Sequence, residues 1–263
     1  MDFVLRDAFM TGFSQRSYDL QRLLHYSFFS EEGLTIHNRG MDALLRFMHA
    51  RADLFRAVYF HRTVRAIDLT LGDLFRDSKA LLFPGNPLEH LDAYLHFTEW
   101  SLLVDAARFA DSNDAPRREL GPRWRDFLAR KVQWQSIYDR NLVFRAADRE
   151  AASLFSDADL LEHRLRKYLP SELADLPLRV DLPRHFYRPQ LQAAASRQNF
   201  LYLPSKRQIR SLNEVQLFES LPISHRFCRV FVPKDAPKQV GEIVAERLDA
   251  LLGGAAGDDL TNM

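Results

Sequence analysis

The sequence is poor in cysteine and in lysine, and each shortage limits what the protein can be. Its 263 residues include one cysteine, Cys228, so no disulfide can form within the chain. We therefore expect a cytoplasmic location, where structural disulfides are rare. Only 6 of the 36 basic residues are lysines, which leaves 36 − 6 = 30 arginines. Arginine suits bidentate phosphate recognition, although a GC-rich genome would produce the same bias.

An excess of charge and a long apolar run are also missing. The 36 basic and 35 acidic residues give a formal net charge of +1, which excludes a global electrostatic attraction to nucleic acid or to an anionic membrane. No stretch approaches the roughly 18 uncharged apolar residues that a membrane-spanning helix needs. Asp2, Arg6 and Asp7 interrupt the N-terminus, where a signal peptide would be apolar. We expect no membrane partner.

The composition that remains is globular, and its apolar spacing is mostly helical. Hydrophobic residues make up 46% of the chain and charged residues 27%, as in ordinary packed domains. Apolar residues at i, i+3, i+4 and i+7 predict amphipathic helices. These expected helices are residues 2–11, 17–25, 41–75, 88–109 and 123–150. The alternating segment 26–38 predicts a hairpin, and residues 83–87 and 111–122 predict loops.

The C-terminal third differs in character. Three short β-type runs, each closed by proline, cover residues 176–183, 199–204 and 226–233, and a helix is expected over 237–252. The sequence therefore predicts a mostly α protein followed by a small α/β region. We expect a helical region over 1–170, the α/β region over 171–252 and a disordered tail over 253–263.

The common catalytic signatures are absent from the sequence. There is no phosphate-binding glycine-rich loop, no Gly-x-Ser-x-Gly, no His-Glu-x-x-His and no Cys-x-x-Cys. None of the nine histidines is followed by aspartate. His49 and His61, twelve residues apart, do not form a metal pair, and Cys228 sits in an alternating strand without a matched base.

Two segments nevertheless resemble motifs of one family. The first pattern is D-x-x-M-D-Y-x-x-R-D-x-x-x-x-G, and residues 1–12 resemble it with the sequence MDFVLRDAFMTG. The second pattern consists of an arginine, Val-Tyr, a histidine and an aspartate, and residues 49–68 resemble it with the sequence HARADLFRAVYFHRTVRAID. Both patterns, in this order and at this spacing, are typical of HD-superfamily deoxynucleoside triphosphate triphosphohydrolases of the dGTPase and SAM-and-HD-domain type. The resemblance is clearest over residues 1–110. It implies an HD-domain-like helical bundle, here incomplete.

The resemblance implies substrate-binding roles for four residues. Phe3 would lie beside the nucleotide and Asp7 would contact the deoxyribose 3′-hydroxyl. Arg51 would contact the triphosphate, and Tyr59 would pack against the sugar. The spacing is compatible with these roles, since Phe3 and Asp7 share a helix face and Arg51 and Tyr59 lie about 12 Å apart along one broad helix side. The alternative is that the two aromatics belong to the core and that Asp7 and Arg51 form ordinary ion pairs.

Further roles follow from the same resemblance. Asp2 matches a supporting aspartate, and Arg22 and Arg39 fall near basic positions that bind effector nucleotides. The metal-binding aspartate of the family's pattern would fall before Met1. We therefore expect no catalytic residue, metal ligand or cofactor in this chain, and a divalent metal only where the missing N-terminal half is present.

These observations predict the substrate-side half of a metal-dependent dNTP triphosphohydrolase, which would convert a dNTP to deoxynucleoside and triphosphate. The chain alone is expected to be inactive, with a dNTP or another nucleotide as ligand and a homo-oligomer as its assembly. The alternative is a non-enzymatic module, derived from that family, for nucleotide binding, nucleic-acid binding or oligomerisation.

Residues 117–145 leave a second question open. Arginines there alternate with Trp124, Trp134 and Tyr138. Such a pattern binds single-stranded nucleic acid by stacking and phosphate contact, and it is equally typical of a core or a subunit interface.

Overall fold

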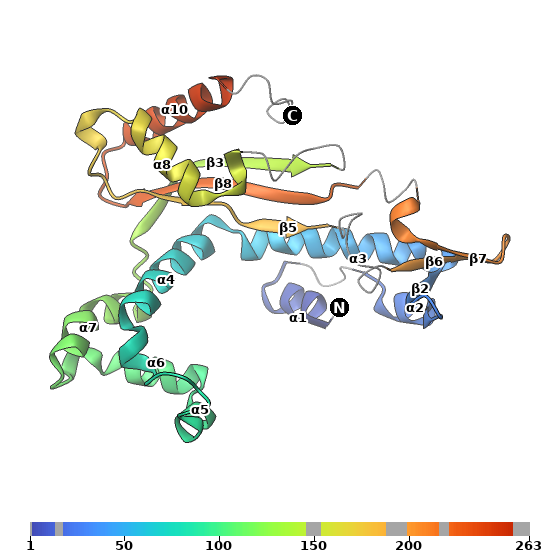
Figure 1. The fold of residues 1–263 in the computed structure, drawn as a ribbon, viewed down its shortest axis with the longest axis horizontal. Coiled ribbons are helices and arrows are strands. Elements are labelled where there is room, and N and C mark those ends of the chain that lie inside the picture. Colours follow the sequence, from blue (N-terminus) through green and yellow to red (C-terminus); the bar gives the residue numbers. More distant parts are fainter. Residues whose placement is uncertain (1, 14–17, 146–153, 188–198, 216–220, 255–263) are drawn as a thin grey trace. The chain divides into compact units, whose positions relative to one another are not determined.

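The computed structural model describes residues 2–13, 18–145, 154–187, 199–215 and 221–254 (Figure 1). The chain forms two compact units. The first comprises Met1–His61, Ile137–Val230 and Pro237–Met263, and the second comprises Arg62–Ser136 and Phe231–Ala236. Each unit is described by itself.

The first unit begins with two short helices and a hairpin. Helix α1 (Asp2–Met10) ends before Gly12, which has the left-handed φ of +70° that glycine tolerates. Helix α2 (Leu20–His25) begins where the Asp19 carboxylate accepts from the backbone N–H of Arg22. Strands β1 (Ser27–Phe29) and β2 (Leu34–His37) then pair antiparallel, which confirms the predicted hairpin.

A four-stranded sheet joins this hairpin to the C-terminal third of the chain. Its order is β1-β2-β6-β7, with β6 (Phe200–Leu203) parallel to β2 and β7 (Gln208–Ser211) antiparallel to β6. Ile36 and Leu201 are register partners, and both are buried. They share one hydrophobic cluster with helix α3 (Met41–Leu54), so the N-terminal and C-terminal segments fold around the same core.

A second sheet is built around β8 (Ser224–Pro233). Its order is β3-β8-β4, from β3 (Trp134–Phe144) and β4 (Arg179–Asp181), and β5 (Arg184–Phe186) also pairs with β8. Side chains on both faces of β8 are buried, and they include Arg226 and Arg229 beside the apolar residues Phe227, Val230 and Phe231. Helix α8 (Ala158–Tyr168) packs on β4 and on α10 (Val240–Gly254). The single-turn helices of the unit are η1 (Asn38–Gly40), η5 (Leu154–Ser156), η6 (Ser171–Leu173) and η8 (Leu212–Glu214).

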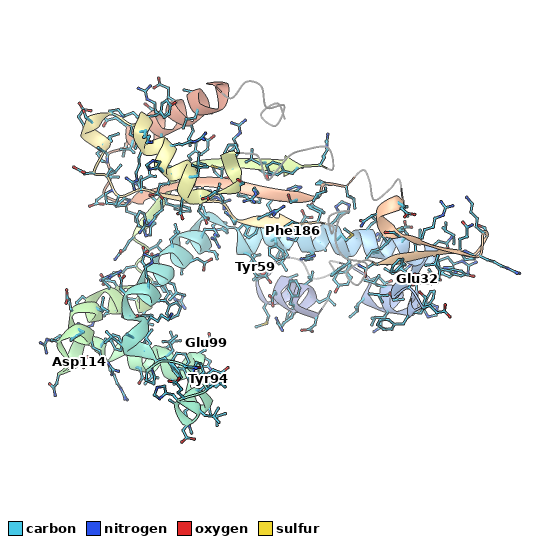
Figure 2. The ribbon with its side chains drawn as sticks, viewed as in Figure 1. Glu32, Tyr59, Tyr94, Glu99, Asp114 and Phe186 are labelled. Carbon is cyan, nitrogen blue, oxygen red and sulfur yellow. The ribbon has the colours of Figure 1, made fainter. Side chains whose placement is uncertain are left out.

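The second unit is mainly helical. It contains α4 (Arg62–Leu82), α5 (Leu91–His96), α6 (Glu99–Ala107), η3 (Phe109–Asp111) and α7 (Ala115–Leu128). Trp124 of α7 is fully buried against Leu74, Ala106 and Phe109. Tyr94 on α5 and Glu99 at the start of α6 lie at the surface (Figure 2).

Four predictions about helices and loops were wrong. The helix expected over 88–109 is divided into α5 and α6 at Phe97, where the backbone is extended, and Thr98 caps the second helix. The helix expected over 41–75 is divided into α3, a π-helical turn η2 (Phe55–Tyr59) and α4. The loop expected over 111–122 contains the start of α7. Gly121-Pro122 lies inside this helix instead of forming a turn, because Gly121 packs closely on η3. A Cβ at Gly121 would lie 2.2 Å from the Cα of Ala110. The helix expected over 123–150 ends at Leu128 and is followed by β3, whose pairing with β8 outweighs its local periodicity.

The whole chain is therefore a mixed α/β protein with two small sheets, where the sequence predicted a mostly α protein with a small α/β region. The division into compact units also differs from the expected boundary at residue 170. The physical reason is that β2 pairs with β6 across that boundary.

Among the helices that the structure describes, none combines the length and apolar character required to cross a bilayer. The tail expected over 253–263 lies outside the described residues beyond Gly254, where α10 ends.

Candidate functional site

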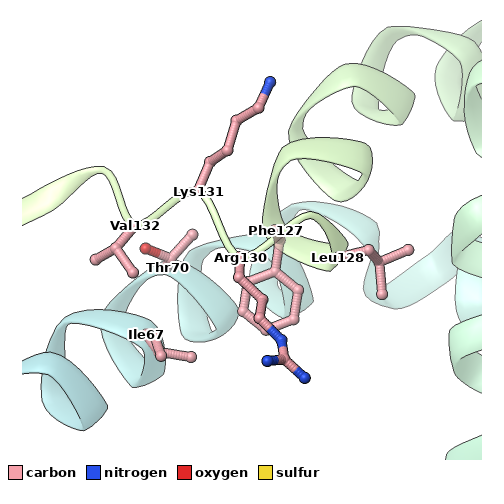
Figure 3. Close-up of a pocket in the computed structure, with 7 residues that line it drawn as sticks. All are labelled: Ile67, Thr70, Phe127, Leu128, Arg130, Lys131 and Val132. Atoms are coloured by element: carbon pink, nitrogen blue, oxygen red, sulfur yellow. The ribbon is translucent and has the colours of Figure 1, made fainter.

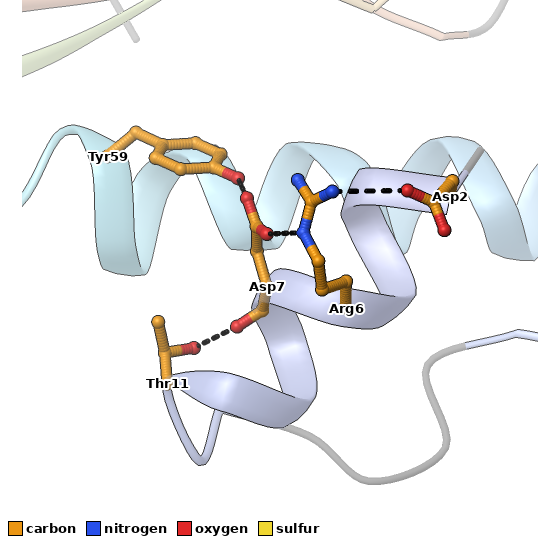
Figure 4. A network of polar contacts seen from close by, with 5 residues as sticks. All are labelled: Asp2, Arg6, Asp7, Thr11 and Tyr59. Carbon is orange, nitrogen blue, oxygen red and sulfur yellow. Dashed lines mark hydrogen bonds and ion pairs between the residues drawn. The ribbon is translucent and has the colours of Figure 1, made fainter. Parts of the chain in front are cut away.

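Two of the residues expected to bind the sugar meet in the structure. Asp7 lies on α1 and Tyr59 lies in the π-helical turn η2, 52 positions later in the sequence. The Tyr59 hydroxyl donates a hydrogen bond to the Asp7 carboxylate (Figure 4). The two elements are held together by Val4, Ala8 and Leu54, which form a buried cluster between α1 and α3.

Arg6 extends this contact into a network that sequence reasoning missed. Its Nε donates to the second Asp7 carboxylate oxygen at 2.9 Å, and its Nη1 lies 3.2 Å from Asp2 Oδ2 (Figure 4). The i, i+4 spacing of Asp2 and Arg6 is the sequence signal that could have predicted this bridge. Asp2 is 88% exposed, so its own ion pair contributes little to stability. Within the described residues, Asp2 is linked to Asp7 through Arg6.

The network fixes the charge state of the pair. The hydrogen bond from Tyr59, followed by that from Arg6, lowers the pKa of the Asp7 carboxyl below its usual range. Burial, and then the bond to Asp7, raise the pKa of Tyr59 to about 12. At neutral pH the site therefore presents an ionised carboxylate beside a protonated phenol. A carboxylate has about four lone-pair positions, so Asp7 can still accept from a ligand hydroxyl.

Arg51, Phe55 and Tyr59 form a continuous row along α3 and η2. The Arg51 guanidinium lies 5.7 Å from the centre of the Phe55 ring, and the Phe55 and Tyr59 ring centres are 4.9 Å apart. Phe55 therefore joins two predicted site residues, each four positions away. Sequence spacing alone could have suggested it, since i, i+4 neighbours share a helix face.

The surroundings of Arg51 suit a phosphate ligand. Burial lowers the pKa of its guanidinium, and among the described residues it has no carboxylate partner. Arg51 lines a cavity of about 190 Å³ together with Tyr187 and Asn213. A half-buried arginine beside neutral polar groups can bind an anion by donating hydrogen bonds to it.

Phe3 is half-buried and packs on the cluster of Val4, Ala8 and Leu54. Arg22 and Arg39, the expected effector-binding residues, do come together. Arg22 Nη2 donates to the backbone carbonyl of Arg39 at 3.2 Å, and its guanidinium lies 5.5 Å from the centre of the Tyr26 ring.

A buried histidine next to the row was not foreseen. His185 of β5 stacks on Phe55 with ring centres 4.3 Å apart and is 4% exposed. Burial, followed by the charges of Arg51 and His225, lowers its pKa to about 4. His185 is therefore neutral at physiological pH. No sequence motif marks it, because its position depends on the pairing of β5 with β8.

The described residues do not fit the divalent metal that the family resemblance implies. Within them, no group of three or more His, Cys, Asp or Glu side chains is arranged to hold a metal ion. We derive no reaction step through a metal from these residues. In the segment 117–145, Trp124 is fully buried, so its ring belongs to the core and is not available for stacking on a nucleic-acid base. Nucleic-acid binding by the rest of the segment stays a prediction.

Curated relatives of the chain are longer than the chain itself. It is 27% identical over 203 residues to the uncharacterized protein YwfO of Bacillus subtilis, a match that covers 72% of this chain and 44% of YwfO. It is 35% identical over 72 residues to the uncharacterized protein MJ1154 of Methanocaldococcus jannaschii, which covers 26% of this chain and 16% of the relative. The chain thus spans less than half the length of these relatives. No family model matches the chain.

Solved structures share the fold. A hypothetical protein from Aquifex aeolicus superposes with a TM-score of 0.61 at 19% identity, over 94% of this chain and 56% of that structure. A phosphohydrolase from Bacteroides thetaiotaomicron superposes with a TM-score of 0.52 at 13% identity, over 87% of this chain and 59% of that structure. At these identities the similarity shows a common fold, which the chain shares with at least one phosphohydrolase.

Proposed function

We propose that this chain supplies the sugar- and phosphate-contacting side of a nucleotide site in an HD-type phosphohydrolase, with a deoxynucleoside triphosphate as ligand. The observation that carries the proposal is the hydrogen bond between Tyr59 and Asp7, because it joins two residues assigned to the sugar by independent motifs. The shared fold with a phosphohydrolase supports the same class of protein.

Each part of the ligand has a matching group. The free lone pairs of Asp7 accept from a 3′-hydroxyl, and the Tyr59 ring packs on the deoxyribose face, where a 2′-hydroxyl would be excluded. Arg51, two helical turns earlier and without a carboxylate partner among the described residues, binds the phosphates. Phe55 supplies apolar surface between the two ends.

Hydrolysis is proposed for the whole protein and not for residues 1–263 alone. The described residues of this chain bind and orient the nucleotide. The divalent metal that the resemblance implies would activate water, and its ligands would come from outside the described residues. We expect no metal-dependent triphosphate release from purified residues 1–263, and measurable release would contradict this part of the proposal.

Calorimetric titration of residues 1–263 with dNTPs and with the matching ribonucleotides tests the binding role. We expect dNTPs to bind more tightly than ribonucleotides. Arg51→Gln should weaken dNTP binding about tenfold or more, because it removes a charge-assisted contact worth roughly 1.5–3 kcal/mol. Asp7→Asn should reduce the difference in binding affinity between deoxynucleotides with and without a 3′-hydroxyl.

Arg56→Gln is the matched control for Arg51. Arg56 lies on the same helical stretch, but it is 58% exposed and pairs with Asp53 at 2.8 Å. We expect Arg56→Gln to leave dNTP affinity unchanged. Equal losses from both exchanges, or no dNTP binding by the parent chain, would refute the proposed site.

A further inference from the structure

The second compact unit contains a hollow that is independent of the proposed nucleotide site. It has a volume of about 460 Å³ and lies between α4 and the segment that follows α7 (Figure 3). Its lining is mainly apolar and consists of Ile67, Thr70, Phe127, Leu128, Arg130, Lys131 and Val132. This volume lies within the range of about 300–1,000 Å³ typical of small-molecule sites.

Arg130 occupies a backbone position at the end of α7 that normally belongs to glycine. Its N–H donates to the Phe127 carbonyl and the N–H of Lys131 donates to the Asp126 carbonyl, both at 2.9 Å. These two bonds define a Schellman motif, in which the residue after the C-cap is left-handed and most often glycine. Arg130 has a φ of +60°, a conformation that side chains other than glycine adopt at a cost.

The two cations at the hollow differ in their partners. Lys131 forms an ion pair with Asp126 at 2.8 Å, and its side chain points away from the hollow (Figure 3). The Arg130 side chain lines the hollow together with Phe127 (Figure 3). Within the part of the chain that the structure describes, its guanidinium has no ion-pair or hydrogen-bond partner. Arg130 is exposed, so a solvated guanidinium without a protein partner among the described residues lines an apolar hollow.

We propose that this hollow binds a small amphipathic carboxylate. The apolar part of the ligand packs among Ile67, Phe127 and Val132, and its carboxylate pairs with the Arg130 guanidinium in the bidentate geometry that arginine favours. The ligand supplies both things that the hollow lacks, an apolar filling and a partner for the charge.

Decanoate, kept below its micelle concentration, is a suitable probe for calorimetric titration of residues 1–263. Decan-1-ol has the same apolar chain without the charge. We expect decanoate to bind at least tenfold more tightly than decan-1-ol. Equal binding of the two, or no detectable binding of decanoate, would overturn the proposal.

Arg130→Gly is the informative variant, because glycine tolerates the left-handed backbone and should preserve the fold. We expect it to weaken decanoate binding at least tenfold while the thermal midpoint stays the same or rises. Arg207→Gly is the matched control, since Arg207 is also left-handed, with a φ of +49°, and lies outside the hollow in the β6–β7 turn. Equal losses of decanoate affinity in Arg130→Gly and Arg207→Gly would show that the Arg130 charge does not bind the carboxylate.

Two further measurements test for other occupants of the hollow, a second copy of the chain and a lipid surface. Ile67→Trp should fill the hollow and abolish decanoate binding without changing the sedimentation coefficient. A change of oligomeric state in this variant would show that a second copy fills the hollow and would overturn the proposal. Binding of anionic vesicles that Arg130→Gly abolishes, without binding of free decanoate, would assign the hollow to a lipid surface instead.

Discussion

At the scale of single residues, the site depends on partners that lie far apart in the sequence. The contact between Tyr59 and Asp7 gives each group a defined protonation state and fixes α1 against η2. Both residues also have structural roles, since Tyr59 packs on the cluster of Val4, Ala8 and Leu54. Of the two alternatives that the sequence left open for Tyr59, its packing in the core is observed, and its contact with a sugar stays a prediction.

His185 predicts how stability depends on pH. Its pKa in the folded chain is about 4, against an ordinary value of 6.5, so the unfolded chain binds more protons between these two pH values. The free energy of unfolding should be highest above pH 6.5 and should fall by about 2–3 kcal/mol as the pH drops to 4. His225 lies beside His185, and burial also lowers its pKa, so it adds to the slope in the same direction.

Urea unfolding at several pH values measures this effect. His185→Phe preserves the aromatic stack on Phe55 and removes the titrating group, so it should flatten the slope between pH 6.5 and 4. His163→Gln, at an exposed position on α8, is the control and should leave the slope as it is. An unchanged slope in His185→Phe would show that His185 is not the residue responsible.

At the scale of elements, the π-helical turn η2 has the largest consequence for the site. It separates α3 from α4 at Phe60, and the buried side chain of Arg229 donates to the Phe60 carbonyl there. Arg229 also pairs with Asp139 at 2.6 Å. Single-turn π segments often occur at functional sites, and this one positions Tyr59. The helical spacing of apolar residues over 41–75 could not reveal the π-helical turn, because the same spacing continues before and after the turn.

Helices α5 and α6 expose an unusual amount of apolar surface for one short segment. Every residue from 91 to 100 is exposed, including Leu95 at 67% and Trp100 at 76%. Exposed apolar side chains that are this frequent in one segment promote association. We expect the isolated chain to self-associate, and Leu95→Glu combined with Trp100→Glu to reduce this association.

Dynamic light scattering at increasing protein concentration provides the measurement. Leu160→Glu with Ile209→Glu serves as the control, because these two apolar residues are exposed at separate places and not in one patch. Association that persists in the α5–α6 variant would exclude this surface as its cause.

At the scale of the whole molecule, the pairing of β2 with β6 sets which segments depend on each other. The cluster under this sheet takes Leu23 and Met41 from the N-terminal part and Leu201 and Leu212 from the C-terminal part. A fragment of residues 1–170 would expose one edge of β2 and half of this cluster. We expect this fragment to lack a cooperative thermal transition.

Circular dichroism and dye binding to apolar surface compare the fragment with the full chain. The full chain should unfold cooperatively and the fragment should bind the dye strongly. A cooperative transition in the fragment would support the division at residue 170 that the sequence predicted.

The sequence by itself determined the local elements and the residue types of the site. It predicted α1, the β1–β2 hairpin, the strands β4, β6 and β8, and the last helix, because amphipathic period, turn residues and caps act within a few positions. It also selected Asp7 and Tyr59 through motifs. Phe55 and Arg6 were within reach of the same spacing rules.

Tertiary structure alone decided the rest. The strand at 134–144 exists because it pairs with β8, and Gly121 belongs to a helix because Ala110 lies against it. His185 could be identified only in the structure, where β5 places it against Phe55. Arg130 likewise could be identified only where the end of α7 places it at an apolar hollow. Partners that are distant in the sequence leave no periodic signal, so their contacts are settled only by packing.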